Sequence, residues 1–252
     1  MPVYHTEAGI VETLEWGEGP ELLVLLHAAA AGPHSLAALA ELLQRPGRRI
    51  VAPALNRYGA TVMRDEADRV GAHRAHLAVL RAVVELCSAE RRLLFGHSMG
   101  GLVGLLGGAW FDTLTLYEPI VTACIPDEVD LLGWDRANVE QADVAAFVSA
   151  WSGTPWDVLP DGARTRIQAM APTLIADMRA VSYGPLPSLA VAQPVVLLQG
   201  SDSPPITHAM TARLASLLPN ASRRVVEGCG HMGPVQQPSV VAAATASLPA
   251  PA

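Results

Sequence analysis

Short, continuous apolar runs alternate with longer segments of helical spacing through the first 120 residues, and again near the carboxyl end. Each run has the length of a strand, and residues 21–27 and 194–200 have the composition of a strand that is buried on both faces, as in a parallel sheet. The runs are residues 21–27, 49–53, 92–97, 113–117, 194–200 and 223–227. Residues 10–16 instead alternate apolar and polar side chains, which predicts an exposed or edge strand.

The segments after these runs are predicted to be helices, and the spacing of apolar residues in 72–88 predicts an amphipathic one. They are residues 34–44, 72–88, 102–110, 206–218 and 238–248. In residues 72–88, Leu77, Leu80, Val84 and Leu86 are predicted to point inward. Strands that alternate with helices predict right-handed crossovers and an α/β fold with a doubly wound, mainly parallel sheet. Such sheets bind ligands beyond the carboxyl ends of their strands.

Residues 120–189 break this alternation, because strand patterns stop and helical patterns take over. The helical segments are 137–151 and 161–179, and three tryptophans lie among them: Trp134, Trp151 and Trp156. A block of this length is too long for an ordinary connection between two buried strands. The sequence therefore predicts a core of residues 1–119 and 190–252, with residues 120–189 inserted as a helical lid. Tryptophan and methionine side chains of the lid either line a substrate pocket or pack the lid on the core.

Composition and charge narrow the class of protein. The chain has 252 residues, of which 50% are hydrophobic and 16% charged, so it can bury a full core as one globular domain. Its net charge is −7, and it has no run of Lys or Arg. These features argue against nucleic acid or an anionic membrane as a partner and favour a small, neutral or weakly polar molecule.

The cysteines and the amino terminus give no sign of secretion. Cys87, Cys124 and Cys229 are odd in number and widely spaced, and they lack the spacing of metal ligands, so we expect neither a disulfide framework nor a metal site. The first residues lack the basic start and apolar core of a signal peptide, and no apolar run has membrane-spanning length. We therefore expect a cytoplasmic protein that needs no cofactor.

The motif Gly96-His97-Ser98-Met99-Gly100 stands between an apolar strand and a segment of helical composition. This is the strand, turn and helix context of a nucleophile elbow, in which the serine occupies the tip of a sharp turn. Side chains at Gly96 and Gly100 would collide with the neighbouring strand and helix. Ser98 is therefore predicted to stand exposed at the carboxyl edge of the sheet, above a helix amino terminus that favours negative charge.

With three other pieces, this motif resembles the α/β-hydrolase superfamily over nearly the whole chain. The other pieces are His27 at the end of a buried strand, Gly200-Ser201-Asp202 after another, and the late Gly228-Cys229-Gly230-His231. The order of nucleophile, acid and histidine agrees as well. The resemblance implies an α/β-hydrolase fold with a serine nucleophile, and it places His27 where it would brace the oxyanion loop. The resemblance does not identify the substrate.

A serine hydroxyl is a poor nucleophile near neutral pH and needs an adjacent base. Among the eight histidines, His231 is the candidate, because a glycine-flanked loop after the last strand lets an imidazole approach Ser98. The oxyanion needs preorganised backbone donors. Met99 N–H is one by its position after the nucleophile, and Ala29 N–H in the loop after His27 is the other. The superfamily usually has glycine where this chain has Ala28.

The triad acid has two candidates. In the commonest pattern of the superfamily, a carboxylate lies three positions after the glycine that ends the next-to-last strand, but Ser203 stands there. Asp202 lies one residue earlier. A minority of members place the acid after the strand that follows the elbow helix, and Glu118 occupies that position. Either carboxylate would fix the tautomer of His231 and stabilise the imidazolium.

The expected function is that of a metal-free serine hydrolase. It would cleave a small, largely apolar carboxylic ester, lactone or thioester through an acyl-enzyme on Ser98. One alternative keeps the fold but changes the reaction, since the superfamily also contains carbon–carbon bond hydrolases, hydroxynitrile lyases and cofactor-free peroxidases. A second alternative is a ligand-binding member without useful turnover, which the departures at Ala28 and Ser203 leave open.

Overall fold

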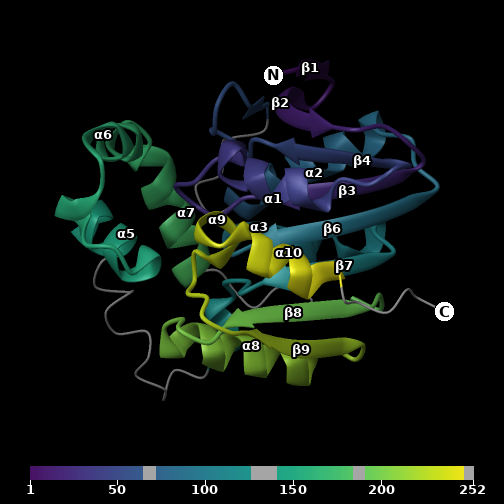
Figure 1. Ribbon diagram of the computed structural model, residues 1–252. Helices are drawn as coiled ribbons and strands as arrows, with labels where there is room; N and C mark the ends of the chain where they lie inside the picture. The colour runs from purple at the N-terminus through teal and green to yellow at the C-terminus, as the bar shows by residue number, and fades with distance from the viewer. Residues whose placement is uncertain (65–71, 126–140, 184–190, 247–252) are drawn as a thin grey trace.

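The computed structural model describes residues 1–64, 72–125, 141–183 and 191–246 (Figure 1). The strands are β1 Val3–Thr6, β2 Gly9–Trp16, β3 Glu21–Leu26, β4 Arg48–Pro53, β5 Val62–Met63, β6 Arg91–His97, β7 Thr113–Tyr117, β8 Val195–Gly200 and β9 Ala221–Val226. The α-helices are α1 Ala37–Leu43, α2 Ala72–Leu86, α3 Met99–Leu106, α5 Val144–Ser152, α6 Asp161–Ala169, α7 Ala171–Tyr183, α8 Pro205–Leu217, α9 Gly233–Gln236 and α10 Pro238–Ala246. Short 3-10 helices are η1 Pro33–Leu36, η2 Gly108–Trp110, η3 Thr122–Cys124 and η4 Trp156–Val158.

The strands of the described residues form one nine-stranded sheet in the order β1-β2-β4-β3-β6-β7-β8-β9, with β5 paired to β2. From β4 to β9 in this order, every pairing is parallel. At the other end, β2 runs antiparallel to β1, β4 and β5. The predicted doubly wound, mainly parallel sheet is thus confirmed.

Helices cover both faces of the sheet, and alternate residues of each buried strand point to opposite faces. Leu22 and Val24 of β3 belong to the hydrophobic cluster that contains side chains of α2, α3 and α8. Leu23 and Leu25 belong to a second cluster, with side chains of α1 and α10. Both clusters exclude water from β3, which explains why its sequence is a continuous apolar run.

Helices α5, α6 and α7 follow β7 and precede β8 in the chain, and Figure 1 shows them grouped beyond one end of the sheet. The sequence predicts one helix over 161–179, but the structure has two, divided at Met170. Pro172 explains the break, because it has no N–H for the carbonyl four residues earlier. Trp134 and the first residues of the predicted helix 137–151 lie outside the described residues.

Two other sequence predictions are wrong. Residues 10–16 are predicted to form an exposed or edge strand, but β2 has only buried and half-buried residues and lies between β1 and β4, and the edge strand is β1. The alternating pattern of β2 reflects burial of one face of an interior strand rather than an edge position. Leu86 was expected to point inward but is 41% exposed. It is the last residue of α2, so no further helical turn covers its side chain.

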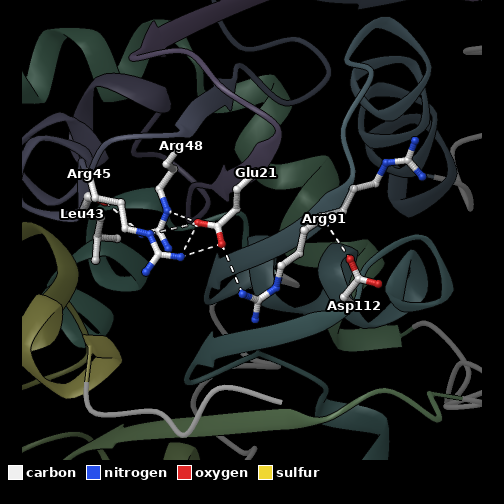
Figure 2. A network of polar contacts seen from close by, with 7 residues as sticks. Glu21, Leu43, Arg45, Arg48, Arg91 and Asp112 are labelled. Carbon is white, nitrogen blue, oxygen red and sulfur yellow. Dashed lines mark hydrogen bonds and ion pairs between the residues drawn. The ribbon is translucent and has the colours of Figure 1, made fainter. Parts of the chain in front are cut away.

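A cluster of charged side chains ties together the amino ends of β3, β4 and β6 (Figure 2). The Glu21 carboxylate pairs with Arg45 and Arg48 at 2.6 Å and with Arg91 at 3.3 Å. Burial alone would raise the pKa of Glu21, but hydrogen bonds from Arg48 and Arg45 hold it below the ordinary value. Partly exposed pairs each contribute about 1 kcal/mol or less, so the cluster chiefly fixes where these strands begin.

The helices within the described ranges lack the combination of length and apolar character that crossing a membrane requires. A cytoplasmic location stays a prediction from the sequence.

Candidate active site

Ser98 stands at a sharp turn between β6 and α3, with φ 55° and ψ −117°. A Cβ at Gly96 would lie 2.7 Å from the Gly100 carbonyl oxygen, and a Cβ at Gly100 would collide with the carbonyl oxygen of Leu26. The predicted steric role of the two glycines is therefore confirmed. The Ser98 backbone N–H donates to the Tyr117 carbonyl oxygen at 3.0 Å, which ties the turn to β7.

The structure brings the hydroxyl of Ser98 and the imidazole of His231 together, with 3.1 Å between Oγ and Nε2. Only 7% of Ser98 and 4% of His231 are exposed, so the prediction that Ser98 stands exposed is wrong: side chains of α5 and α7 such as Trp151 and Met178 line the cavity around it. His231 lies in the loop between β9 and α9, and two side chains fix that loop. His97 Nε2–H donates to the His231 carbonyl oxygen, and the Tyr117 hydroxyl donates to that of Gly230, both at 2.8 Å. The imidazole thus approaches Ser98 from the glycine-flanked loop predicted by the sequence.

Glu118 follows β7 and is fully buried, with a left-handed φ of 46°. Its Oε2 lies 2.7 Å from His231 Nδ1, and its Oε1 accepts the Gly200 N–H at 2.8 Å. A carboxylate can only accept, so Nδ1 carries the proton and the lone pair of Nε2 faces Ser98. Ser98, His231 and Glu118 therefore form one continuous chain of hydrogen bonds.

Asp202, the other candidate acid, has an exposed side chain that accepts from the Ser201 hydroxyl at 2.8 Å. The same hydroxyl accepts the Gly228 N–H at 2.8 Å, and the Asp202 N–H donates to the Cys229 carbonyl oxygen at 2.9 Å. Asp202 thus supports the loop that carries His231. Among the described residues, the carboxylate bonded to the His231 ring is that of Glu118.

Ala29 and Met99, whose N–H groups are the predicted oxyanion donors, lie beside Ser98. Within the described parts of the chain, neither Ala29 N–H nor Met99 N–H donates to a protein acceptor, and both residues line the same cavity as Ser98. Among the non-glycine residues of the loop after β3, Ala30 has a left-handed φ of 61°, and Ala28 does not have a positive φ. The departure at Ala28 therefore requires no strained backbone there.

His27 braces this loop, as the resemblance implied. Its Nδ1–H donates to the Ala28 carbonyl oxygen at 2.8 Å, and its Nε2 accepts the Leu55 N–H at 3.0 Å. Burial lowers the pKa of His27 to about 4, so the ring is neutral near pH 7. A neutral ring is required, because only it can donate at one nitrogen and accept at the other.

A cavity of about 50 Å³ adjoins the Ser98 side chain. Its lining is mainly apolar and comes from the core and from helices α5 and α7: Ala28, Ala29, Ser98, Met99, Ile120, Phe147, Trp151, Asp177, Met178, Val181, His231 and Met232. The Trp151 ring lies 4.9 Å from the His231 ring, measured between centroids. Trp156 instead packs within the helical insertion, against the cluster of Val148, Leu174 and Met178.

Sequence reasoning did not single out Asp177, which is 3% exposed and is the charged residue of this lining outside the Ser98, His231 and Glu118 chain. An aspartate on an otherwise ordinary helix carries no motif. Its partners Tyr58 and His76 lie 119 and 101 residues earlier in the chain, so the sequence gives no sign that this carboxylate is buried and paired. In residues 1–64, 72–125, 141–183 and 191–246, no three His, Cys, Asp or Glu side chains are grouped so that they could hold a metal ion.

Comparison with known proteins agrees with this architecture. Solved structures with similar folds include a putative lipase from Acinetobacter baumannii AYE, with TM-score 0.77 and 19% identity over 97% of this chain and 89% of that one. An esterase from Exiguobacterium antarcticum has TM-score 0.76 and 13% identity, with 97% of each chain covered. A bromoperoxidase from Bacillus anthracis has TM-score 0.71 and 13% identity, with 94% of each chain covered.

At these identities, the likeness establishes the fold and not the reaction. No curated protein matches this sequence. The sequence model of the alpha/beta hydrolase family matches residues 23–244, which is most of the chain. The strand order, the elbow and this match lead to one conclusion: the chain belongs to the alpha/beta hydrolase family.

Proposed function

We propose that the protein is a serine hydrolase that cleaves a small, largely apolar carboxylic ester, lactone or thioester through an acyl-enzyme on Ser98. The observation that carries this proposal is the buried chain of hydrogen bonds beside an apolar cavity. Ser98 Oγ lies 3.1 Å from His231 Nε2, and His231 Nδ1 lies 2.7 Å from Glu118 Oε2. Nucleophile, base and orienting acid thus have the mutual geometry that acyl transfer requires.

In the first half-reaction, Ser98 Oγ attacks the substrate carbonyl carbon while His231 Nε2 takes the hydroxyl proton. The ring becomes an imidazolium, which the fully buried Glu118 carboxylate stabilises. The tetrahedral intermediate collapses when His231 gives the proton to the leaving oxygen or sulfur. The alcohol or thiol departs, or in a lactone stays attached to the acyl chain as a free hydroxyl, and the acyl group stays on Ser98.

In the second half-reaction, a water molecule takes the place of the leaving group and loses a proton to His231 as it attacks the acyl carbon. The Ser98 oxygen then recovers that proton, and the carboxylic acid is released. Both tetrahedral intermediates place negative charge on the former carbonyl oxygen. Ala29 N–H and Met99 N–H, which have no protein acceptor in the described structure, are the proposed donors to that oxygen.

The size and lining of the cavity favour a substrate with a short, apolar acyl group. Its volume is about 50 Å³, and by the same measure one water molecule needs about 10 to 15 Å³, so the cavity holds only a few groups of that size. Phe147 and Trp151 of α5 and Met178 and Val181 of α7 close it with apolar side chains. We also propose that residues 120–189 act as the lid predicted from the sequence, because these helices exclude water from the reacting groups.

Replacement of the nucleophile tests the proposal. Ser98→Ala is expected to abolish hydrolysis of p-nitrophenyl acetate, and intact-mass measurement should show that a fluorophosphonate labels the wild type and not this variant. Ser203→Ala is the matched control, because this buried hydroxyl has no hydrogen-bond partner in the described structure and should be dispensable. Wild-type turnover in Ser98→Ala would refute the proposal.

A further inference from the structure

A second buried chain of polar groups lies beside the cavity, outside the proposed triad. The Asn56 N–H bonds to His76 Nδ1 at 3.1 Å, and His76 Nε2 bonds to Asp177 Oδ1 at 2.9 Å. The Tyr58 hydroxyl bonds to Asp177 Oδ2 at 2.8 Å, and the Ala30 N–H bonds to the Tyr58 hydroxyl at 3.1 Å. Tyr58, His76 and Asp177 are each 3% exposed or less.

The direction of every bond in this chain follows from its two ends. The Asn56 N–H can only donate, so His76 Nδ1 accepts and the proton of a neutral His76 sits on Nε2, facing Asp177. A carboxylate can only accept, so the Tyr58 hydroxyl donates to Asp177, and its lone pair receives the Ala30 N–H. Burial and the neighbouring carboxylate raise the pKa of Tyr58 well above its ordinary value, which keeps this donor protonated.

The chain ends at a strained point of the backbone. Ala30 has a left-handed φ of 61°, which is sterically unfavourable for a residue with a Cβ. Its neighbour Ala29 supplies one of the proposed oxyanion donors. If Ala30 relaxed to a negative φ, the Ala29–Ala30 peptide would rotate against the rest of the loop, and the backbone of Ala29, which lines the cavity beside Ser98, would shift with it. The bond from Ala30 to the Tyr58 hydroxyl opposes that relaxation.

Asp177 joins this loop to the helical insertion. It lies on α7, whereas Tyr58 follows β4 and His76 belongs to α2. The carboxylate polarises the Tyr58 O–H bond, which makes the phenol oxygen a better acceptor for Ala30. Removal of α7 from the core would leave both Tyr58 and His76 without their acceptor. The position of α7 and the shape of the loop after β3 are therefore coupled through one carboxylate.

We infer that Asp177 is a positioning residue that, through the Tyr58 hydroxyl, holds Ala30 in its left-handed conformation and so directs the Ala29 N–H at the substrate carbonyl. This inference rests on the proposed function, because it assigns a role in the same reaction. It makes docking of α7 and completion of the oxyanion hole a single event. Asp177 acts in this way without forming a bond to the substrate.

Tyr58→Phe and Asp177→Asn test this role with little change in volume. Loss of one oxyanion donor costs roughly 10²- to 10³-fold, and a misdirected donor should cost less, so we expect kcat to fall roughly 10- to 100-fold with KM nearly constant. The double variant should be no slower than the slower single variant, because both changes break the same chain. Ala30→Gly should restore much of the kcat of Tyr58→Phe, since glycine adopts φ 61° without the steric strain.

His73→Leu is the matched control. His73 also joins α2 to α7, because its Nε2–H donates to the Ala180 carbonyl oxygen at 2.8 Å, but in the described residues the hydrogen bonds of the Tyr58 hydroxyl go to Ala30 and Asp177 and not to His73. If the effect of Asp177→Asn were only a loosened α7, His73→Leu would reproduce it. We expect kcat within about twofold of the wild type in this variant, since the loop after β3 keeps its support.

Amide hydrogen exchange of residues 28–32 supplies a readout that does not depend on activity. Exchange should be faster in Tyr58→Phe and Asp177→Asn than in the wild type and His73→Leu. If fluorophosphonate labels wild-type Ser98 but Tyr58→Phe keeps its kcat, the inference is overturned and the proposed function stands. A raised KM with constant kcat in Asp177→Asn also overturns it, because Asp177 would then bind substrate.

If Ser98 in the wild type is not labelled and no ester is turned over, the proposed function has failed, and exchange alone decides the structural part of the inference. Faster exchange in Tyr58→Phe and Asp177→Asn then supports the hold of Asp177 on the loop. Unchanged exchange in both variants overturns it.

Discussion

Replacing Glu118 with glutamine changes one atom of the site and leaves its volume almost intact. The carboxylate now accepts two hydrogen bonds, from His231 Nδ1–H at 2.7 Å and from Gly200 N–H at 2.8 Å. A glutamine can satisfy only one of them, because its amide group has one acceptor oxygen and one donor nitrogen. Both orientations of the amide are therefore unfavourable, and they impair catalysis for different reasons.

If the amide oxygen faces His231, the NH2 group meets the Gly200 N–H, and two buried donors oppose each other at a cost of roughly 1 to 3 kcal/mol. If the NH2 group faces His231, Nδ1 must accept, the ring proton moves to Nε2, and the base towards Ser98 is lost. In either case the charge that stabilises the imidazolium disappears, which costs roughly a further 1.5 to 3 kcal/mol. The combined loss corresponds to a fall of about 10²- to 10⁴-fold in kcat/KM.

The assay is hydrolysis of p-nitrophenyl acetate near neutral pH by the wild type, Glu118→Gln and Asp202→Asn, with circular dichroism to verify folding. Asp202→Asn is the matched control, because this carboxylate is exposed and bonds to Ser201 rather than to His231. We expect its kcat/KM to stay within about twofold of the wild type. The assignment of Glu118 as the triad acid would be refuted if kcat/KM fell more in Asp202→Asn than in Glu118→Gln and Glu118→Gln stayed nearly as active as the wild type.

Two further predictions concern the buried histidines and the cavity. Burial lowers the pKa of His27 to about 4 and that of His97 to about 3, whereas the unfolded chain titrates near 6.5. Below pH 6.5 the unfolded state therefore binds protons that the folded state excludes. In urea unfolding, the free energy of unfolding should decrease as the pH is lowered from 7 to 5, by up to about 1.4 kcal/mol per pH unit for each histidine. A free energy of unfolding that stays constant or increases over this range would contradict the burial of neutral rings. Because the cavity measures about 50 Å³, kcat/KM for p-nitrophenyl acetate should exceed kcat/KM for p-nitrophenyl octanoate at least about tenfold. Trp151→Ala should reduce this ratio, because it removes a side chain that lines the cavity. A preference of the wild type for octanoate would contradict the proposed acyl site.

The sequence by itself determined the parts of the fold that short-range patterns encode. Strands such as β3 were predictable because burial on both faces requires an unbroken apolar run. The turn at Ser98 was predictable because Gly96 and Gly100 have no room for a Cβ. Short antiparallel strands such as β1 were missed, since they carry too few residues for a recognisable pattern.

Tertiary structure alone brought Glu118 rather than Asp202 to the ring of His231. Both residues follow neighbouring parallel strands, so both lie at the same edge of the sheet, and the sequence offers no means to choose between them. The left-handed backbone of Glu118 and its bond to Gly200 direct its carboxylate at His231, whereas Asp202 turns to Ser201. Such a choice depends on side-chain direction across the sheet, which no local pattern records.

The chain from Ala30 to Asp177 was hidden from the sequence for the same reason. Tyr58 and Asp177 are 119 residues apart and belong to no common motif. Each looks ordinary within its own segment, and they become partners only because α7 packs on the core. Apolar periodicity and glycine sterics act between neighbours in sequence and can be predicted there. Hydrogen bonds between buried side chains depend on long-range packing, and only the folded chain decides them.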